Sequence, residues 1–395
     1  MNGLAINMYQ QRVIAPLLPV AIAFILGIIV GRYTDYGAFT TLAILAGLIG
    51  IALCLFRFPK VQSLFILLIT MVMGCHLIQH PLPDIPVVKR AGERMLEYRE
   101  QLLQQYRATM NPATYEVVAA MTLGDKTALT KETREKFNMT GASHILAISG
   151  LHLGIIYMMV SLLAWGRRWR IVAQVLTLVL LWGFAFLVGL PASVVRATTM
   201  LTIYGLLSLG YRQNSSINVL AFTAIVILAC QPEALFEVGF QMSYLAVFAI
   251  LLFYPTLYGM ISEKWLMEHR VVRWVWGMTT VSLCAQLGVG PLIAFYFHRF
   301  STYFLLTNFI VIPCAYLILV GGFLLLLTSW TMIASALATV VTIMTQSLTA
   351  IAALPIASIG NLYPSLLQTV LVYVLIGCLS IIFLKLWQTY SVSYR

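Results

Sequence analysis

The sequence predicts an all-α polytopic integral membrane protein with about 12 transmembrane or re-entrant helices and one amphipathic extracytoplasmic helical segment. Three observations lead to this fold class. Of the 395 residues, 61% are hydrophobic and 9% are charged, whereas soluble domains contain about 25% charged residues. Apolar runs of about 20 residues, the length that crosses a bilayer, recur along the chain. The basic residues favour alternate loops, as the positive-inside rule requires.

The predicted spans are the apolar runs that polar or helix-breaking residues separate. They cover residues 13–30, 38–56, 62–79, 143–164, 171–189, 192–209, 216–231, 238–256, 275–297, 303–326, 331–352 and 366–386. No small-residue cleavage pattern follows the first run, which therefore indicates an uncleaved span rather than a signal peptide. The seventh run is short and the ninth contains Gly-Val-Gly-Pro, so either one can be broken or re-entrant.

The loop charges predict the orientation of these spans. If the N-terminus is cytoplasmic, the inner loops and the C-terminal tail contain most of the basic residues. These are Arg57, Lys60, Arg167, Arg168, Arg170, Arg212, Lys264, Arg270, Arg273, Lys385 and Arg395. The short outer loops contain only Arg32, Arg196 and Arg299. This asymmetry predicts a multi-pass protein of the inner membrane with both termini in the cytoplasm, and it explains the net charge of +11 without nucleic acid.

The chain divides into four predicted regions: three spans over residues 1–79, an outer segment over 80–142, a membrane domain over 143–388 and a cytoplasmic tail over 389–395. In the outer segment, Met95, Leu102, Leu103 and Tyr106 share one face of a predicted helix, and arginine and glutamate cover the other face. Such helices lie on a membrane or on partner helices. The glutamates nearly match the basic residues, so this helix would attract a phosphate backbone only weakly.

Two short helices are predicted after this amphipathic helix. Asn111 is placed to cap the first, and Pro112 suits its first turn. The second runs from Thr130 to about Thr140 and ends at Gly141, which predicts a break before the next span.

The fourth span begins with the unusual stretch Ser-His-Ile-Leu-Ala-Ile-Ser-Gly-Leu-His, residues 143–152. If the helix is continuous, His144 and His152 lie two turns apart on one face, with Ser149 at its edge. Gly150 permits close helix approach or local unwinding. We therefore expect this stretch to line a polar cavity or to lock neighbouring helices together.

A catalytic interpretation of Ser149 and His152 is possible but incomplete. A catalytic triad also needs an orienting acid and an oxyanion hole, and the acid closest in sequence, Asp125, lies outside the span. The two histidines have no third metal ligand, and the sequence contains neither HExxH nor a phosphate-binding loop. We therefore predict no catalytic residues, no metal and no cofactor, with a membrane enzyme as an alternative.

Polar residues in other spans extend this pattern. They are Arg196, Gln241, Ser243, Gln286 and Asn308. Helix breaks are predicted at Gly141, Pro191, Pro291 and Pro313. Hydrogen bonds between helices explain each polar residue alone. Together they predict a polar seam that could line a passage for a hydrophilic substrate.

Four sequence blocks resemble, in order, the signature of the ComEC-type competence family. The matching residues are Gly124, Asp125, Gly141, His144, Ser149, Gly150 and His152 in the first block; Arg196 in the second; Pro232, Gly239, Gln241 and Ser243 in the third; and Gln286, Pro291, Asn308 and Pro313 in the fourth. The resemblance covers roughly residues 110–385. It implies an inner-membrane channel that translocates single-stranded DNA into the cytoplasm during natural transformation.

The resemblance also implies partners and a departure from the family pattern. Full-length members combine the membrane domain with an outer OB-like domain and a C-terminal metallo-β-lactamase-like domain. The outer segment is too short and too helical for the first, and the sequence stops at Arg395 before the second, so either a short form or a chain cut at a domain boundary is expected. A separate DNA receptor, a nuclease-type protein and a helicase or ATPase are the implied partners, besides single-stranded DNA and the lipid bilayer.

Several alternatives stay open on the sequence alone. Arg196 is the best candidate for a phosphate contact near the outer mouth, but a bond from its side chain to backbone carbonyls is nearly as good an interpretation. The missing DNA-handling domains favour a transporter for a small hydrophilic or anionic solute as the second function. A membrane scaffold for competence partners is the third. A pore could lie within one chain or between copies.

Overall fold

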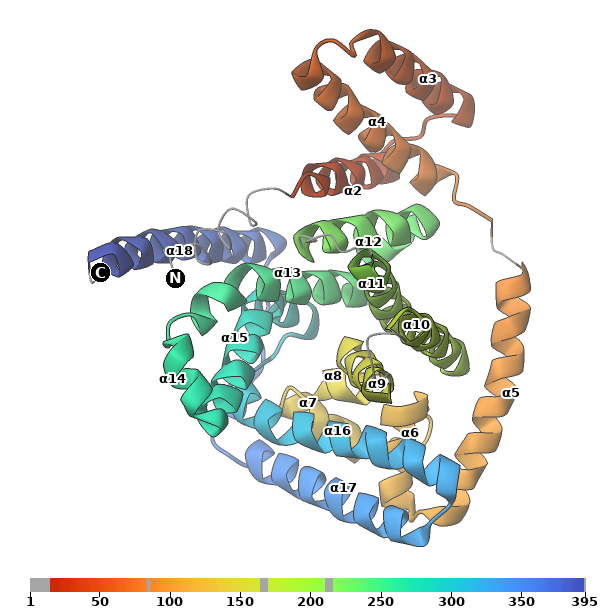
Figure 1. Cartoon of the computed structure of the whole chain (residues 1–395), viewed down its shortest axis with the longest axis vertical. Coiled ribbons are helices and arrows are strands. Elements are labelled where there is room, and N and C mark those ends of the chain that lie inside the picture. The colour runs from red at the N-terminus through yellow and green to blue at the C-terminus, as the bar shows by residue number, and fades with distance from the viewer. Residues whose placement is uncertain (1–14, 84–85, 164–169, 210–215, 394–395) are drawn as a thin grey trace. The chain divides into compact units, whose positions relative to one another are not determined.

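Helices account for most of the described chain, and their order follows the apolar runs of the sequence (Figure 1). The computed structural model describes residues 15–83, 86–163, 170–209 and 216–393. The first helices are α2 (Leu17–Tyr33), α3 (Ala38–Cys54), α4 (Pro59–Gln79), α5 (Pro86–Thr109), α6 (Pro112–Leu123), α7 (Lys131–Met139), α8 (Ser143–Leu146) and α9 (Gly150–Leu163). Then come α10 (Arg170–Leu187), α11 (Ala192–Leu209), α12 (Ser216–Cys230), the 3₁₀ helix η2 (Pro232–Phe236), α13 (Val238–Tyr258), α14 (Glu263–Glu268), α15 (Arg270–Phe297), α16 (Phe304–Thr328), α17 (Thr331–Ala352) and α18 (Leu366–Ser393). An antiparallel ladder joins β1 (Phe300–Ser301) to β2 (Ser358–Ile359).

The predicted spans correspond to these apolar helices. Among the described residues, six helices are long and apolar enough to cross a membrane: α4, α13, α15, α16, α17 and the Leu366–Phe383 part of α18. The shorter apolar helices α2, α3, α9, α10, α11 and α12 fall on the remaining predicted spans. This correspondence confirms the all-α polytopic fold class, and the chain is a multi-pass membrane protein.

The orientation of the chain stays a prediction. Four of the cations on which it rests lie outside the described residues: Arg167, Arg168, Arg212 and Arg395. The tail predicted over residues 389–395 continues α18 as far as Ser393, and residues 394–395 lie outside the described part of the chain.

Two of the predicted helix breaks are wrong, because Pro291 lies inside α15 and Pro313 lies inside α16. A proline removes one backbone donor, whereas ending the helix in apolar surroundings would expose several unpaired groups. A neighbouring helix also supports the turn before Pro291, where the Tyr373 hydroxyl of α18 donates to the Gly288 carbonyl at 2.8 Å. The predicted breaks at Gly141 and Pro191 are confirmed, since each lies between two helices.

The chain forms two compact units that interleave along the sequence. Unit 1 comprises Met1–Ala91, Ala164–Trp182 and Val195–Tyr244, and unit 2 comprises Gly92–Leu163, Gly183–Val194 and Leu245–Arg395. Each unit is described by itself below. The linear regions predicted over residues 1–79, 80–142 and 143–388 stay predictions.

Close packing of α2 against α4 organises the first part of unit 1. Gly27 of α2 lies against the Met71 backbone of α4, where a Cβ atom would collide with the Met71 carbonyl. Phe24, Ile28 and Leu77 continue this contact into an apolar cluster with α12 and η2. Small residues allow such approach in membrane proteins, where packing rather than water expulsion holds helices together.

The core of unit 2 forms around α6, which is buried from Thr114 to Leu123. Asn111 caps this helix as predicted, accepting a hydrogen bond from the Thr114 amide at 2.8 Å. The predicted amphipathic helix is α5, and its Leu103 and Tyr106 are fully buried in the same core as α6, α16 and α17. The apolar face of α5 therefore packs on partner helices, one of the two arrangements that its pattern allowed.

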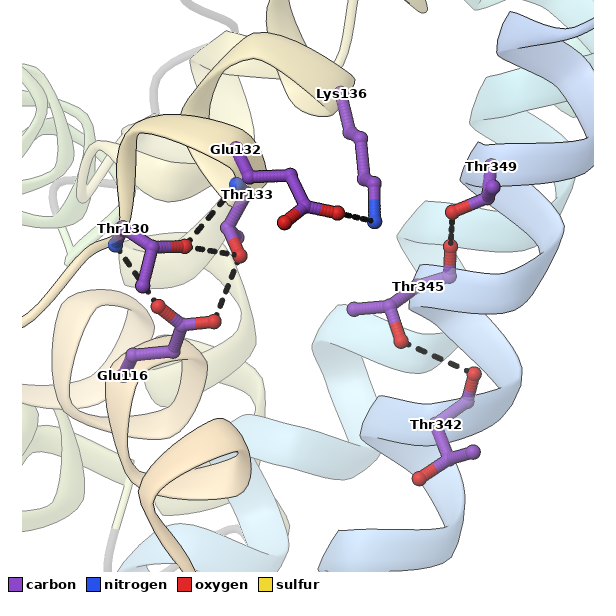
Figure 2. Close-up of polar contacts among 8 residues, drawn as sticks. All are labelled: Glu116, Thr130, Glu132, Thr133, Lys136, Thr342, Thr345 and Thr349. Atoms are coloured by element: carbon purple, nitrogen blue, oxygen red, sulfur yellow. Dashed lines mark hydrogen bonds and ion pairs between the residues drawn. The ribbon is translucent and has the colours of Figure 1, made fainter.

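Polar contacts connect α6 to the charged helix α7 (Figure 2). The Glu116 carboxylate, on the largely apolar α6, accepts from the Thr130 amide at 2.9 Å and from the Thr133 hydroxyl at 2.7 Å. Thr130 is the N-cap of α7. Lys136 and Glu132 form an ion pair, with Nζ and Oε1 2.8 Å apart, on the side of α7 that faces α17 (Figure 2). On α17, the hydroxyls of Thr345 and Thr349 donate to carbonyls of the same helix. These contacts fix the start of α7, the helix that leads to the Gly141 break.

The α2–α4 contact generates a stability prediction. We expect Gly27→Ala to lower the free energy of unfolding by about 1–3 kcal/mol, because the added methyl group forces the two backbones apart. Gly47→Ala on α3 is the matched control, since a Cβ atom there meets nothing within 4 Å. Thermal unfolding of the detergent-solubilised protein measures both variants. Equal midpoints for the two would show that α2 and α4 do not approach this closely.

Candidate functional site

A polar cavity of about 450 Å³ lies in unit 2, where three loops of the sequence blocks meet. Its lining residues are Arg99, Gly124, Asp125, Lys126, Thr127, Ala147, Ile148, Pro191 and Ser193. They come from α5, from the loop after α6, from the interruption between α8 and α9, and from the start of α11, where Pro191 precedes the helix and Ser193 lies in its first turn. The cavity therefore joins segments far apart in the chain.

The loop after α6 is shaped by Gly124 and Asp125. Gly124 ends the helix in the left-handed region, with φ of 74°, a conformation that glycine adopts without strain. Asp125 is 4% exposed, and its carboxylate accepts from the Thr127 amide at 3.0 Å, the Thr127 hydroxyl at 2.6 Å and the Tyr115 hydroxyl at 3.2 Å. Asp125 thus holds the loop in one conformation.

The charge state of Asp125 follows from these contacts. Burial by itself raises the pKa of the carboxyl, but the two hydrogen bonds from Thr127, the bond from Tyr115 and the positive charge of Arg99 outweigh it. The pKa of Asp125 therefore lies below its ordinary value of 3.8. Its charge is stabilised by the loop and by cations, as in a structural carboxylate.

The interruption between α8 and α9 corrects the prediction of one helical face. Residues 147–149 are not helical, so His144 and His152 do not lie on one continuous helix. His144 is exposed, and its Nδ1 donates to the Gly141 carbonyl at 3.0 Å. Sequence spacing missed this interruption because apolar residues flank it on both sides.

Ser149 and His152 instead form a cap at the start of α9. Nδ1 of His152 accepts from the Ser149 amide at 3.2 Å and lies 3.0 Å from the Ser149 hydroxyl oxygen. Residue 152 occupies the third helical position, where glutamate or glutamine bonds to the cap amide in a capping box. A backbone amide can only donate, so Nδ1 carries no proton. The neutral ring then has its proton on Nε2, which is buried and has no hydrogen-bond partner among the described residues.

The first turn of α11 is hydrogen-bonded to this interruption by a side chain that the sequence analysis did not single out. The Ser193 hydroxyl donates to the Ile148 carbonyl at 2.7 Å. Gly189 and Leu190 both have positive φ, which bends the chain ahead of Pro191. The start of α11 therefore supports the interruption between α8 and α9 at the wall of the cavity.

This geometry is not that of a catalytic triad. The Ser149 hydroxyl meets the same His152 nitrogen that accepts from the backbone, and the oxygens of Asp125 are occupied by Thr127 and Tyr115. Among the described residues, no group of three histidine, cysteine or acidic side chains could hold a metal ion. The prediction that the protein is not an enzyme stays a prediction.

The seam residues of unit 1 make helix–helix contacts. Arg196 is 4% exposed, donates from Nη2 to the Gly239 carbonyl at 2.8 Å and lies over the Phe240 ring. The Arg196 side chain therefore makes the bond to a backbone carbonyl that the sequence analysis gave as the alternative to a phosphate contact. Gln241 donates to the Leu235 carbonyl at 3.1 Å, and Ser243 is half-buried on α13.

The seam residues of unit 2 lie in separate places. Asn308 of α16 donates to the Ser282 hydroxyl of α15 at 3.2 Å. Gln286 lines a second cavity of about 550 Å³, which is mainly apolar and contains Pro291, Phe300 and Phe304. Neither residue lines the polar cavity, and Gly150 is exposed at the start of α9.

Comparison with known proteins identifies the family. Residues 121–386 match the family Competence protein. The chain belongs to this family. The four sequence blocks lie within the match, as do eight of the nine lining residues of the polar cavity, whereas Arg99 precedes it.

The alignments with curated relatives cover between 27% and 37% of each relative's length. The chain is 30% identical over 225 residues to ComE operon protein 3 of Bacillus subtilis (strain 168), which covers 56% of this chain and 27% of that protein. It is 25% identical over 223 residues to Recombination protein 2 of Haemophilus influenzae (strain ATCC 51907 / DSM 11121 / KW20 / Rd), covering 54% of this chain and 28% of the relative. An uncharacterized protein of Aquifex aeolicus (strain VF5) is 36% identical over 170 residues, 43% of this chain and 37% of that protein. No solved structure matches the chain.

The hydrogen bond from the Ser149 amide to His152 predicts that two substitutions of His152 reduce stability by different amounts. We expect His152→Ala to lower the free energy of unfolding by about 0.5–2 kcal/mol, as the loss of a helix cap does. His152→Gln keeps an acceptor for the Ser149 amide and should lose less. Thermal unfolding of the purified protein measures both. Equal loss in the two variants would contradict the capping role.

The low pKa of Asp125 predicts a pH-dependent stability. An ionised group with a lowered pKa stabilises the fold above its unfolded-state pKa, and this contribution disappears as the pH falls through the folded-state value. Asp125→Asn should therefore lower the thermal midpoint at neutral pH, and its difference from the native protein should shrink as the pH falls below 3.8. The exposed Asp35→Asn is the control. A difference that stays constant with pH would count against a charged Asp125.

Proposed function

We propose that this protein provides the inner-membrane passage through which single-stranded DNA enters the cytoplasm during natural transformation. Membership of the Competence protein family supports this function. So do the similarities to ComE operon protein 3 and Recombination protein 2, whose names refer to competence and recombination.

The structural observation that carries the proposal is the polar cavity at the interruption between α8 and α9 and at the turn between α10 and α11. α9 and α11 are both apolar helices, yet both begin at a cavity with charged side chains. Non-helical backbone among apolar helices is tolerated where it is buried in protein or faces a water-filled space. A strand with one negative charge per nucleotide needs such a wet, donor-rich surface, because hydrocarbon cannot solvate it.

The remaining elements of the function follow from this proposal. Both termini lie in the cytoplasm, as the loop charges indicate. The chain itself performs no bond-breaking chemistry and needs no cofactor. A DNA receptor, a nuclease-type protein and a helicase or ATPase supply the strand and the driving force as separate partners.

Deletion of the gene in its naturally competent host tests the proposal. We expect transformation by added DNA to be lost and to return when this chain is expressed from another locus. Electroporated linear DNA bypasses the passage, so recombinants from electroporation should form at the normal frequency. Normal transformation in the deletion strain would contradict the function. Loss of recombinants from both routes would place the protein after entry and would also contradict it.

A transporter for a small anionic or hydrophilic solute is the second candidate. The polar cavity favours it too, because a volume of about 450 Å³ lies within the range of small-molecule sites. Proteoliposomes that take up small organic anions but no fluorescent single-stranded oligodeoxynucleotide would support this transporter over the DNA passage.

A further inference from the structure

We infer that the polar cavity of unit 2 binds the phosphodiester groups of a nucleic-acid strand and that Arg99 of α5 is its main contact. The inference rests on the proposed function and adds a binding residue that the sequence blocks do not contain. It also reassigns the phosphate contact from Arg196, which lines neither described cavity, is 4% exposed and donates from Nη2 to the Gly239 carbonyl in unit 1.

Arg99 has hydrogen-bonding capacity to spare at the cavity wall. Its Nε is buried and has no hydrogen-bond partner among the described residues. Its Nη2 lies 3.6 Å from a Glu100 oxygen, and the Glu100 side chain is 58% exposed, so solvent weakens this pair. An arginine fork with open donors matches the oxygen atoms of a phosphate group.

Asp125 offsets only part of this positive charge, because it is one carboxylate beside two cations of the cavity lining, Arg99 and Lys126. Three donors from Thr127 and Tyr115 satisfy its carboxylate, which is almost completely buried. Arg107 donates from Nε to the Tyr115 hydroxyl at 2.9 Å and adds a second cation behind the carboxylate. Arg99 and the exposed Lys126 therefore leave the cavity side of the loop with an excess of positive charge.

The backbone around the cavity adds to this preference. α9 begins at Gly150, two residues after the lining residue Ile148, and α11 begins at Ala192, between the lining residues Pro191 and Ser193. The first amides of a helix lack partners within it and carry partial positive charge. Two helix starts beside an arginine and a lysine favour an anion over a cation or a neutral solute.

The lining chemistry favours a nucleic-acid strand over a phospholipid headgroup, which is also a phosphodiester. A bound lipid needs an apolar track for its acyl chains, and only Ala147, Ile148 and Pro191 of the cavity lining are apolar. The apolar cavity at Phe300 and Phe304 shares no lining residue with it. Six of the nine lining residues are glycine, polar or charged, which favours a phosphate contact over the binding of acyl chains.

Binding of a fluorescent single-stranded oligodeoxynucleotide to the whole protein in nanodiscs tests this inference. We expect Arg99→Gln to weaken binding about tenfold to a hundredfold, as the loss of a charged hydrogen bond does. The slope of log affinity against log salt should also fall by about 0.7, the value for one phosphate contact on a single strand. A merely structural role would not change this slope.

Two matched variants control the measurement. Arg94→Gln removes an exposed arginine from the same helix and should leave the affinity unchanged, because Arg94 does not line the cavity. Arg99→Lys keeps the charge but loses the fork, so it should retain the salt slope with weaker binding. It also replaces Arg99→Gln as the test if that variant does not fold, as judged by its thermal midpoint.

Each outcome has a definite meaning. An unchanged affinity and salt slope in Arg99→Gln would overturn the inference. So would a loss of phosphatidylglycerol binding with strand binding intact, which would assign the cavity to lipid. Transformation of the host separates this failure from that of the proposed function. If gene deletion abolishes transformation but Arg99→Gln does not reduce it, the result supports the proposed function and contradicts the phosphate site at Arg99.

Discussion

Unit 2 is constrained most by the backbone groups that the interruption between α8 and α9 and the turn before α11 leave unpaired among apolar helices. Each group needs a partner, because an unsatisfied amide or carbonyl costs several kcal/mol in hydrocarbon, on the order of its full desolvation. The Ser149 amide donates to Nδ1 of His152, and the Ile148 carbonyl accepts from the Ser193 hydroxyl. The first bond closes the start of α9, and the second joins it to the start of α11 at the wall of the polar cavity.

The charges of the cavity follow from how this wall is supported. The Asp125 carboxylate accepts hydrogen bonds within the loop after α6 and from the Tyr115 hydroxyl, which itself accepts from Arg107. Arg99 has no comparable partner, so its charge remains available at the cavity. A family signature residue therefore acts as a structural anchor, while a residue outside the signature carries the proposed contact with DNA.

Sequence reasoning succeeded where local patterns decide structure and failed where neighbours decide it. Apolar run length located the spans, and Asn111 was found as a cap because capping depends on the next few residues. The expected common face of His144 and His152 was wrong, since the interruption at residues 147–149 depends on Ser193 from a distant turn. Pro291 did not end α15, where Tyr373 of α18 supports the preceding turn.

The sequence by itself determined the membrane class, the number and order of apolar helices, and the family, because composition and motif order are properties of the chain alone. Only the tertiary structure decided which polar residues share a cavity. Glutamates along α5 nearly balance its arginines, so the sequence predicted little attraction for phosphate. In the fold, Arg99 lies at the cavity with one weak acidic contact, because the site depends on which side chains are brought together rather than on the charge of a segment.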